Sequence, residues 1–304
     1  MIDIVVIGSG PAGLTAAIYA RRSGKSVVVL ENNSFGGQMT WSPRVQNYPG
    51  FPSISGNELA DKMIEQASEL GVEIEFDNVV MLKKNGTFFK IFTDNAEYSC
   101  KSVIIASGSK HRTLGLPKEE EFVGKGVSYC ALCDGAFYQD KNIAVIGGGN
   151  SALQEIILLA DIAKHVTVIQ NLSHLTGEQS MIELVNEKEN VSILASTIVT
   201  GLIGKKSLEA IAIESSEHGN KRDLPVDGIF VAIGQKPDNE VFQNVCKLDE
   251  NGFIVADESC LTSTPGIFAA GDCRTKKIRQ IVTACGDGAI SALGACRYID
   301  KLSD

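Results

Sequence analysis

Two cysteines, Cys130 and Cys133, form the part of this 304-residue sequence that is best suited to covalent chemistry. Their Cys-x-x-Cys spacing lets the thiols close a small reducible ring, in which one thiol lowers the pKa of the other. A structural zinc site needs four ligands, and the chain has neither a second Cys-x-x-Cys pair nor a pair of histidines at metal-binding spacing. We therefore expect a redox-active dithiol and no bound metal.

Asp134 follows the second cysteine directly. A carboxyl group beside a dithiol can carry the proton that thiolate chemistry requires. The alternative is that Asp134 only caps a helix or a turn. The remaining six cysteines are isolated, and we expect them to be small core residues because a disulfide framework is not expected in an intracellular chain of this length. They are Cys100, Cys246, Cys260, Cys273, Cys285 and Cys296.

A glycine-rich turn near the N-terminus predicts a dinucleotide site. An apolar strand from Ile4 to Ile7 leads into a Gly-x-Gly-x-x-Gly turn, an amphipathic helix and a second strand that ends in Glu31. The glycines permit a tight turn and a close approach of the backbone to a pyrophosphate, which then lies at the helix N-terminus. The acid is placed to accept hydrogen bonds from an adenosine ribose. The turn glycines are Gly8, Gly10 and Gly13.

A second copy of this pattern begins 139 residues later (147 − 8). It comprises Gly147-x-Gly149-x-x-Ala152, a helix, and a strand that ends near Gln170. Here the strand is followed by "NLSHLTGEQ", which offers neither an acid for a ribose at the strand end nor an arginine for a phosphate. The glycines alone are weak evidence for a ligand, because a tight strand–helix turn needs glycine in any case.

A third strand, Ile267 to Ala270, ends in Gly271-Asp272, and a carboxylate at that end of a parallel strand points into a ligand crevice. These elements predict an α/β fold with two Rossmann-like, three-layer nucleotide-binding domains, the second inserted into the first. We expect the first domain at residues 1–112 and 243–304, and the inserted domain at 113–242, because the connecting stretches are polar and contain Pro and Gly.

Composition narrows the classes of protein further. The 44% hydrophobic content and 30 glycines fit a globular α/β chain. The net charge of −9 argues against nucleic-acid binding, which needs a basic face. No apolar stretch approaches the ~20 residues of a membrane span. The N-terminus enters a strand without a signal-like segment, so we expect a cytoplasmic location and no membrane partner.

Over nearly its whole length the chain resembles the low-molecular-weight thioredoxin reductases. The matching pieces occur in the order typical of that family: "GSGPAG", "GGQMT", "VQNYPG", "IIASG", "CALCDGAFY", "GGGNSA", "GIFAAGD" and "RQIVTACGDG". The resemblance implies FAD in the first domain, a flavin-reducible disulfide in the second, and a homodimer. It also implies a domain rotation that presents the disulfide first to the flavin and then to thioredoxin.

By position, the resemblance implies a catalytic set of Cys130, Cys133 and Asp134. It implies FAD contacts from Gly8, Gly10, Gly13, Glu31, Gly37, Gln38, Asn47, Gly271, Asp272, Arg279 and Gln280. The family often has two adjacent aromatic residues after "DG", where this chain has Ala136 and Phe137.

The electron donor is where the chain departs from the family pattern. The NADPH-dependent members end the second strand of the insert with His-Arg-Arg and have another arginine four residues on. The corresponding residues here are Gln170, Asn171, Leu172 and Thr176. Loss of two or three charge-assisted phosphate contacts weakens binding by roughly 3–9 kcal/mol. We therefore expect no NAD(P)H cofactor. The pattern is similar to the ferredoxin-dependent flavin thioredoxin reductases, which implies that ferredoxin reduces the flavin.

Three alternatives remain open from the sequence. The chain could use NADH or NADPH through a weak site, since its second glycine turn is kept. It could be a flavin dithiol oxidase that passes electrons to oxygen, although the "CDG" context argues against that. It could also be a non-catalytic flavin-binding or redox-sensing module. If ferredoxin is the donor, this acidic chain needs a local basic patch to dock it. We expect the patch at Arg274, Lys276 and Lys277, with Lys110, His111 and Arg112 as the second choice.

Overall fold

The computed structural model describes residues 1–42, 44–217 and 219–303, and it divides the chain into two compact units. Unit 1 comprises Met1–Lys110 and Lys236–Asp304, and unit 2 comprises His111–Gln235. The chain passes between the units within two short strands, β7 (Lys110–His111) and β16 (Gln235–Lys236).

The second boundary therefore lies at 235/236, not at the predicted 242/243. The reason is that the short 3₁₀ helix η3 (Glu240–Phe242) packs within unit 1. Phe242 is 1% exposed in its core, and Asn239 donates hydrogen bonds to the carbonyl oxygens of Gly252 and Cys273. The buried side chains of Phe242 and Asn239 therefore hold this polar stretch in unit 1.

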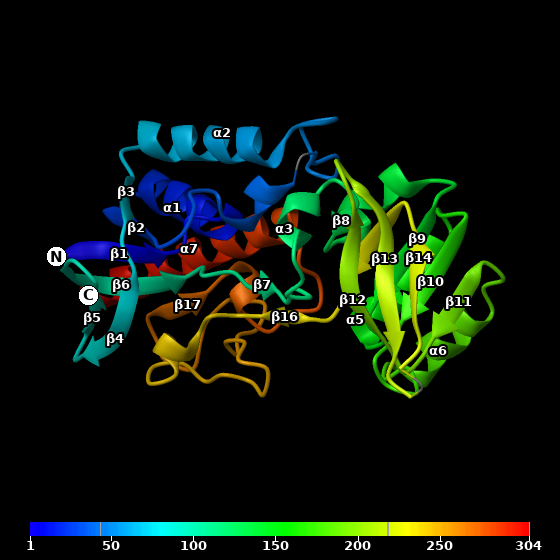
Figure 1. Cartoon of the computed structure of the whole chain (residues 1–304). Helices are drawn as coiled ribbons and strands as arrows, with labels where there is room; N and C mark the ends of the chain where they lie inside the picture. The colour runs from blue at the N-terminus through cyan, green and yellow to red at the C-terminus, as the bar shows by residue number, and fades with distance from the viewer. Residues whose placement is uncertain (43, 218, 304) are drawn as a thin grey trace. The chain divides into compact units, whose positions relative to one another are not determined.

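Unit 1 is built on a seven-stranded sheet in the described residues, with the order β3-β2-β1-β6-β5-β4 and β17 paired to β6 (Figure 1). Strands β1, β2, β3, β6 and β17 are parallel, and β4 and β5 form an antiparallel extension. The central strands are rich in Ile and Val and are buried on both faces, as parallel sheets require. The bounds are β1 Ile2–Ile7, β2 Val27–Glu31, β3 Glu73–Phe76, β4 Val79–Asn85, β5 Phe88–Thr93, β6 Glu97–Ile105 and β17 Ile267–Ala269.

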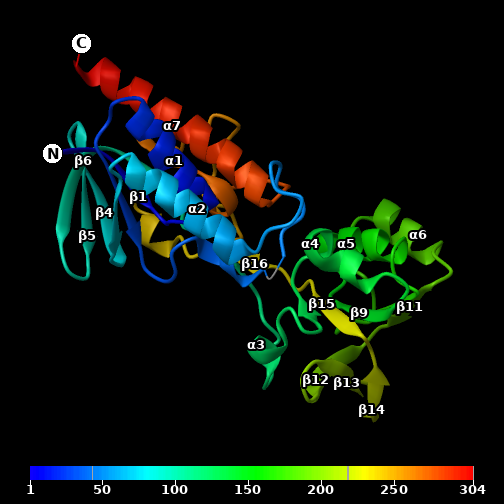
Figure 2. The ribbon, with the colours of Figure 1, turned by 90° about the horizontal axis from the view of Figure 1, so that it is seen from above.

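Three helices cover one face of this sheet, as Figure 2 shows. They are α1 (Pro11–Arg22), α2 (Gly56–Glu69) and α7 (Ile281–Ser303). Helix α1 begins with Pro11, which is suited to the first helical position because that residue's N–H would have no partner within the helix. The second core lies on the opposite face. Two 3₁₀ helices, η1 (Gly37–Trp41) and η4 (Gly271–Cys273), follow strand ends in this unit.

Unit 2 has a five-stranded parallel sheet in its described residues, with the order β11-β10-β9-β15-β8. One core lies between this sheet and helices α4, α5 and α6, and the other lies beneath an antiparallel sheet of β12, β13 and β14. The strands are β8 Val127–Ser128, β9 Asn142–Ile146, β10 His165–Ile169, β11 Val191–Leu194, β12 Thr197–Gly204, β13 Leu208–Ser215, β14 Lys221–Pro225 and β15 Gly228–Val231. The helices are α3 Glu119–Phe122, α4 Ala131–Asp134, η2 Gly135–Tyr138, α5 Asn150–Ala160 and α6 Gln179–Asn186.

The predicted fold class is confirmed: both units are Rossmann-like layered α/β structures. Of the six isolated cysteines, five are buried as expected and Cys285 is only partly buried. None of the described helices combines the length and the apolar character that a membrane span requires. The cytoplasmic location stays a prediction.

Candidate redox site and dinucleotide turns

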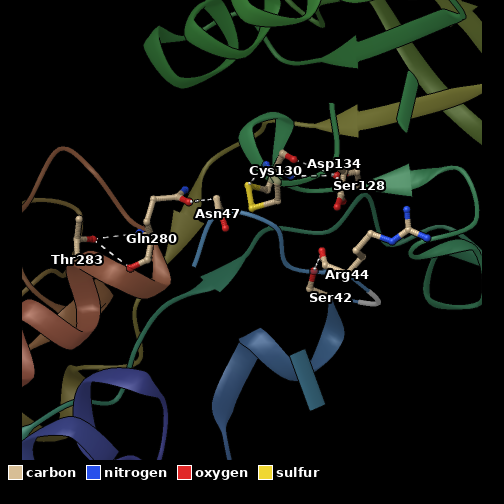
Figure 3. Close-up of a disulfide and its surroundings, with 9 residues drawn as sticks. Ser42, Arg44, Asn47, Ser128, Cys130, Asp134, Gln280 and Thr283 are labelled. Atoms are coloured by element: carbon tan, nitrogen blue, oxygen red, sulfur yellow. Dashed lines mark hydrogen bonds between the residues drawn. A yellow bond between two sulfur atoms is a disulfide. The ribbon is translucent and has the colours of Figure 1, made fainter. Parts of the chain in front are cut away.

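Cys130 and Cys133 form a disulfide in unit 2, with their Cα atoms 5.3 Å apart (Figure 3). Cys130 precedes the short helix α4 as its N-cap, and its Sγ accepts a hydrogen bond from the Cys133 amide at 3.1 Å. Both side chains are partly exposed, whereas Ala131 between them is buried. The Cys130 sulfur is therefore the one beside a backbone donor, which favours negative charge on that atom after reduction.

Asp134 lies at the end of α4, and its carboxylate accepts a 2.6 Å hydrogen bond from the Ser128 hydroxyl. The same Ser128 oxygen accepts the amide N–H of Cys130 at 3.1 Å. Burial raises the pKa of Asp134, although the bond from Ser128 opposes this. A carboxyl with a raised pKa that is joined through one hydroxyl to the cysteine backbone is suited to hold a proton near the dithiol.

Sequence reasoning missed Ser128, although it lies only two residues before the first cysteine. It is buried at the end of β8, and its hydroxyl fixes both the Cys130 amide and the Asp134 carboxylate. Serine occurs in many strands without a functional role. The only sign in the sequence was therefore the short distance between Ser128 and the cysteine motif.

The first glycine turn of unit 1 joins β1 to α1, and its glycines are required for different reasons. Gly8 has φ +106°, and a Cβ there would lie 2.3 Å from the Ala106 carbonyl oxygen at the end of β6. A Cβ at Gly13 would lie 1.9 Å from the Gly8 carbonyl oxygen. A Cβ at Gly10, by contrast, would meet no described atom within 4 Å. The turn thus packs closely underneath and leaves open space over Gly10, where a pyrophosphate would approach.

Glu31 closes the end of β2 beside this turn and is 7% exposed. Its Oε2 accepts hydrogen bonds from the Ser9 amide (2.7 Å) and hydroxyl (2.8 Å), and its Oε1 accepts the Asn33 amide (2.9 Å). A carboxylate has about four acceptor positions, so one remains for a ribose hydroxyl.

Residues far apart in the sequence meet around the turn of unit 1. A Cβ at Gly37 would lie 3.1 Å from the Cα of Gly10, so η1 begins directly against the turn, with Gln38 as its next residue. Gly271 lies against Ala12 in the first turn of α1. Figure 3 shows a further pair: the Asn47 side chain donates to Gln280 Oε1 at 3.1 Å.

Asp272 supplies the strongest sign that unit 1 holds a polar ligand. Its Oδ1 is shut off from solvent and has no hydrogen-bond partner among the described residues. Burial raises the pKa of Asp272 to about 6, although Lys276 and Arg279 oppose this. A buried polar atom without a partner costs about 1–3 kcal/mol, which a ligand hydroxyl would relieve. Arg279 lies over the ring of Phe253, 4.3 Å from its centroid, and donates to the Asp272 backbone carbonyl at 3.5 Å.

These residues fit FAD, which combines a pyrophosphate with the hydroxyls of its ribose and of its ribityl chain. The fit rests on the open space over Gly10 and on the unpartnered Asp272 oxygen. In the described residues no group of His, Cys, Asp and Glu side chains is arranged to hold a metal ion.

The second glycine turn, in unit 2, keeps its backbone but differs in chemistry. Gly147 has φ +130°, and a Cβ there would lie 2.4 Å from the Ala232 carbonyl oxygen. Gln170 stands in the position that Glu31 has in unit 1, is 4% exposed, and donates its amide to the His174 carbonyl at 3.1 Å. Thr176 follows, with its amide bound to the Gly148 carbonyl at 2.7 Å.

The basic patch that we expected at Arg274, Lys276 and Lys277 is wrong. Arg274 and Lys276 have side chains that are 6% and 8% exposed, and both bind the buried carboxylate of Asp287. Only Lys277 is exposed.

The second-choice patch keeps two exposed cations, Lys110 and Arg112, and loses the third expected one, His111. Burial lowers the pKa of His111 to about 4, so this ring is neutral at pH 7, and it stacks on Tyr129 with 5.4 Å between centroids. Lys110 belongs to unit 1, whereas His111 and Arg112 belong to unit 2.

A two-unit dinucleotide fold with a redox disulfide in one unit and an open glycine turn in the other defines a flavoprotein type of disulfide oxidoreductase. Residues 2–288 match the family model described as pyridine nucleotide-disulphide oxidoreductase, and the chain belongs to that family.

Individual relatives cover almost the whole chain. The chain is 42% identical to the "34.2 kDa protein in rubredoxin operon" of Clostridium pasteurianum, over 98% of this chain and 97% of that protein. It is 39% identical to a thioredoxin reductase of Listeria innocua, over 99% and 95% of the two chains. Among solved structures, thioredoxin reductase from Streptococcus pyogenes superposes with a TM-score of 0.94 at 40% identity, covering 99% of each chain.

Proposed function

We propose that this protein is a thioredoxin reductase that uses FAD and receives its electrons from a reduced ferredoxin. The activity is supported by the disulfide at Cys130 and Cys133 and by relatives of that name at about 40% identity. Electrons pass from ferredoxin to FAD, then to the disulfide, then to thioredoxin.

FAD, when bound, supplies a centre that accepts electrons one at a time and donates them in pairs. Gly8, Gly10 and Gly13 form the turn that would hold its pyrophosphate, and Glu31 would accept from its ribose. Asp272 would accept from a hydroxyl of the ribityl chain, which explains its unpartnered oxygen. Gly37, Gln38, Asn47, Gly271, Arg279 and Gln280 complete the proposed set.

The residues of unit 2 carry the disulfide chemistry. The Cys133 amide stabilises negative charge on the Cys130 sulfur, so we assign the attack on thioredoxin to Cys130. Asp134, held by Ser128, supplies and recovers a proton during exchange. The proposed cycle includes a rotation of unit 2 that presents the pair first to the flavin and then to thioredoxin.

The end of β10 carries the proposal about the donor. In unit 1 the corresponding strand ends in a charged acceptor, Glu31, whereas in unit 2 it ends in a neutral, buried Gln170 whose amide is bound to His174. The following positions hold the exposed side chains of Asn171, Leu172 and Thr176, none of which carries a positive charge that could form an ion pair with a phosphate. The energetics permit ferredoxin, because a donor near −400 mV and a thioredoxin near −270 mV give about 6 kcal/mol for two electrons.

The retained turn at Gly147 and Gly149 favours a second candidate, in which NADPH or NADH is the donor. Its backbone keeps the positive φ that a nucleotide-binding turn needs, and a Cβ at Gly149 would meet only the Thr176 hydroxyl, at 3.8 Å. The family name, which includes pyridine nucleotides, points the same way.

Anaerobic mixing of the FAD-loaded protein with NADPH, NADH and reduced ferredoxin, each alone, separates the two donors. We expect only ferredoxin to bleach the flavin band rapidly and to support thioredoxin turnover. Flavin reduction by micromolar NADPH would overturn the donor assignment but leave the activity in place. Oxygen uptake in the absence of thioredoxin would favour a dithiol oxidase, and no disulfide turnover with any donor would favour a redox-sensing module.

The proposed homodimer is supported by an exposed apolar face on and before α7. Ile278, Val282, Ile290 and Leu293 are 58%, 45%, 42% and 41% exposed. Exposed apolar side chains that gather on one element favour a protein interface. Sedimentation of the purified protein at micromolar concentration tests this, with a Val282→Glu, Leu293→Glu variant expected to be monomeric.

A further inference from the structure

A second carboxyl group lies behind the cysteine motif, and sequence reasoning did not single it out. Glu155 is on α5, which packs against α4 in unit 2. The backbone amide of Ala131, the residue that follows Cys130, hydrogen-bonds the Glu155 carboxyl. The other carboxyl oxygen, Oε2, is shut off from solvent and has no partner among the described residues.

This arrangement disfavours the ionised form of the Glu155 carboxyl. Burial is the larger influence and raises the pKa of Glu155 to about 8, although the Ala131 amide opposes it. The titratable side chains on the elements packed against α5 are Asp134 and, after reduction, Cys133 on α4, Glu183 on α6 and His165 on β10. None of them is a fixed cation that would hold the carboxylate charged. Near neutral pH the group is therefore protonated.

We propose that Glu155 is a positioning residue for the dithiol step: its neutral carboxyl holds the Ala131 amide at the start of the Cys-x-x-Cys turn and allows the adjacent Cys130 sulfur to carry a thiolate. An ionised Glu155 would place a second negative charge beside that thiolate and disfavour it. The proposal rests on the proposed redox role of the cysteine pair.

The charge on Cys130 appears during the following steps of reduction and exchange. Reduction by a thiol such as glutathione breaks the Cys130–Cys133 bond, takes two electrons and two protons from two molecules of that thiol, which become a disulfide, and forms two thiols on the protein. Cys130 then loses a proton, and its thiolate attacks one sulfur of the substrate disulfide, so that a mixed disulfide forms and one substrate thiolate leaves and is protonated. Cys133 next loses its proton and attacks Cys130, which restores the motif disulfide and releases the second substrate thiol. The protonation state of Glu155 affects the step in which Cys130 is a thiolate.

The test compares the redox equilibrium of the cysteine pair in wild type and in Glu155→Gln, using the FAD-loaded full chain in anaerobic glutathione buffers. The fraction of Cys130–Cys133 disulfide is counted by mass spectrometry after acid quenching and alkylation. At pH 6 the two proteins should agree within about twofold, because both side chains are neutral there. At pH 9.5 the reduced form should be favoured about tenfold more in Glu155→Gln, since a neighbouring like charge shifts a pKa by about one unit. Tenfold corresponds to about 30 mV for two electrons.

Gln154→Glu is the matched control, because it adds a carboxylate to the same helix at an exposed position and should change neither value. Glu155→Met, which removes the carboxyl with little change in volume, should reproduce the high-pH result if Glu155→Gln folds poorly. A ratio that is the same at both pH values, or one of opposite sign, would overturn the proposal. Neither thioredoxin nor ferredoxin takes part, so failure of the proposed function leaves this test valid.

Discussion

Replacing Asp287 with Asn should destabilise unit 1 strongly, because this carboxylate holds two buried cations. Its Oδ1 and Oδ2 accept from Arg274 at 2.9 Å each, and Oδ2 also accepts from Lys276 Nζ and from the Gly271 amide, again at 2.9 Å. The side chains of all three charged residues are no more than 8% exposed. The substitution keeps the shape and removes the carboxylate that directly binds Arg274 and Lys276.

The magnitude follows from that burial. Removing one partner of a buried ion pair costs about 3–5 kcal/mol, because the remaining charge stays out of water. Unit 1 has 179 residues (110 + 69), a size for which each kcal/mol lowers Tm by about 2–4 °C. We therefore expect Tm to fall by roughly 6–20 °C.

The assay is thermal and urea unfolding of Asp287→Asn and wild type, followed by near-ultraviolet circular dichroism at a fixed excess of FAD, since a bound ligand itself adds stability. Glu97→Gln is the control, because it breaks a pair with Lys90 whose side chains are 44% and 35% exposed, and such pairs contribute about 0–1 kcal/mol.

The pH dependence gives a second check. Burial raises the pKa of Asp287, but the bonds from Arg274 and Lys276 outweigh it and lower the value overall. A depressed pKa stabilises the fold above the unfolded pKa of about 3.9 and ceases to do so as pH falls through the folded value. The gap between variant and wild type should therefore close in acid. A loss no larger than that of Glu97→Gln at pH 7 would refute the reasoning.

Three further outcomes are expected. Cys130→Ser or Cys133→Ser should abolish thioredoxin reduction and leave FAD bound, and visible absorbance together with turnover checks both; near wild-type turnover in either variant would contradict the assignment. Asp134→Asn should slow dithiol exchange by about 10²–10⁴-fold in stopped-flow assays, whereas a loss below about threefold would favour a capping role. In wild type the raised pKa of Glu155 means that the folded state binds more protons between pH 4.5 and about 8, so the free energy of unfolding should fall as pH rises through that window. Urea titrations of Glu155→Gln should show a flatter profile, and an unchanged slope would mean that the group ionises freely.

Local spacing determined much of this protein from its sequence alone. The Gly8 and Gly147 turns need glycine because a Cβ would clash with a neighbouring carbonyl oxygen. The glycine pattern therefore predicts the strand–turn–helix unit from sequence. The redox dithiol was also predictable from local spacing, since cysteines three apart at a helix start can close a disulfide, as Cys130 and Cys133 do with Cα atoms 5.3 Å apart. Of the residues proposed to contact FAD, the turn glycines, Glu31 and Asp272 came from such local patterns, and the others came from the resemblance.

Tertiary structure decided the residues whose partners lie far away in the chain. In the sequence, Arg274 and Lys276 resemble a solvated basic segment. In the structure, both side chains are buried and bind the carboxylate of Asp287 on α7. The boundary between the units differs from the predicted one because Phe242 packs in the core of unit 1. Glu155 is an ordinary helical acid until α5 packs on α4 and removes its carboxyl from water. In each case burial sets the chemistry of the group, and burial depends on which elements pack together, which no short stretch of sequence contains.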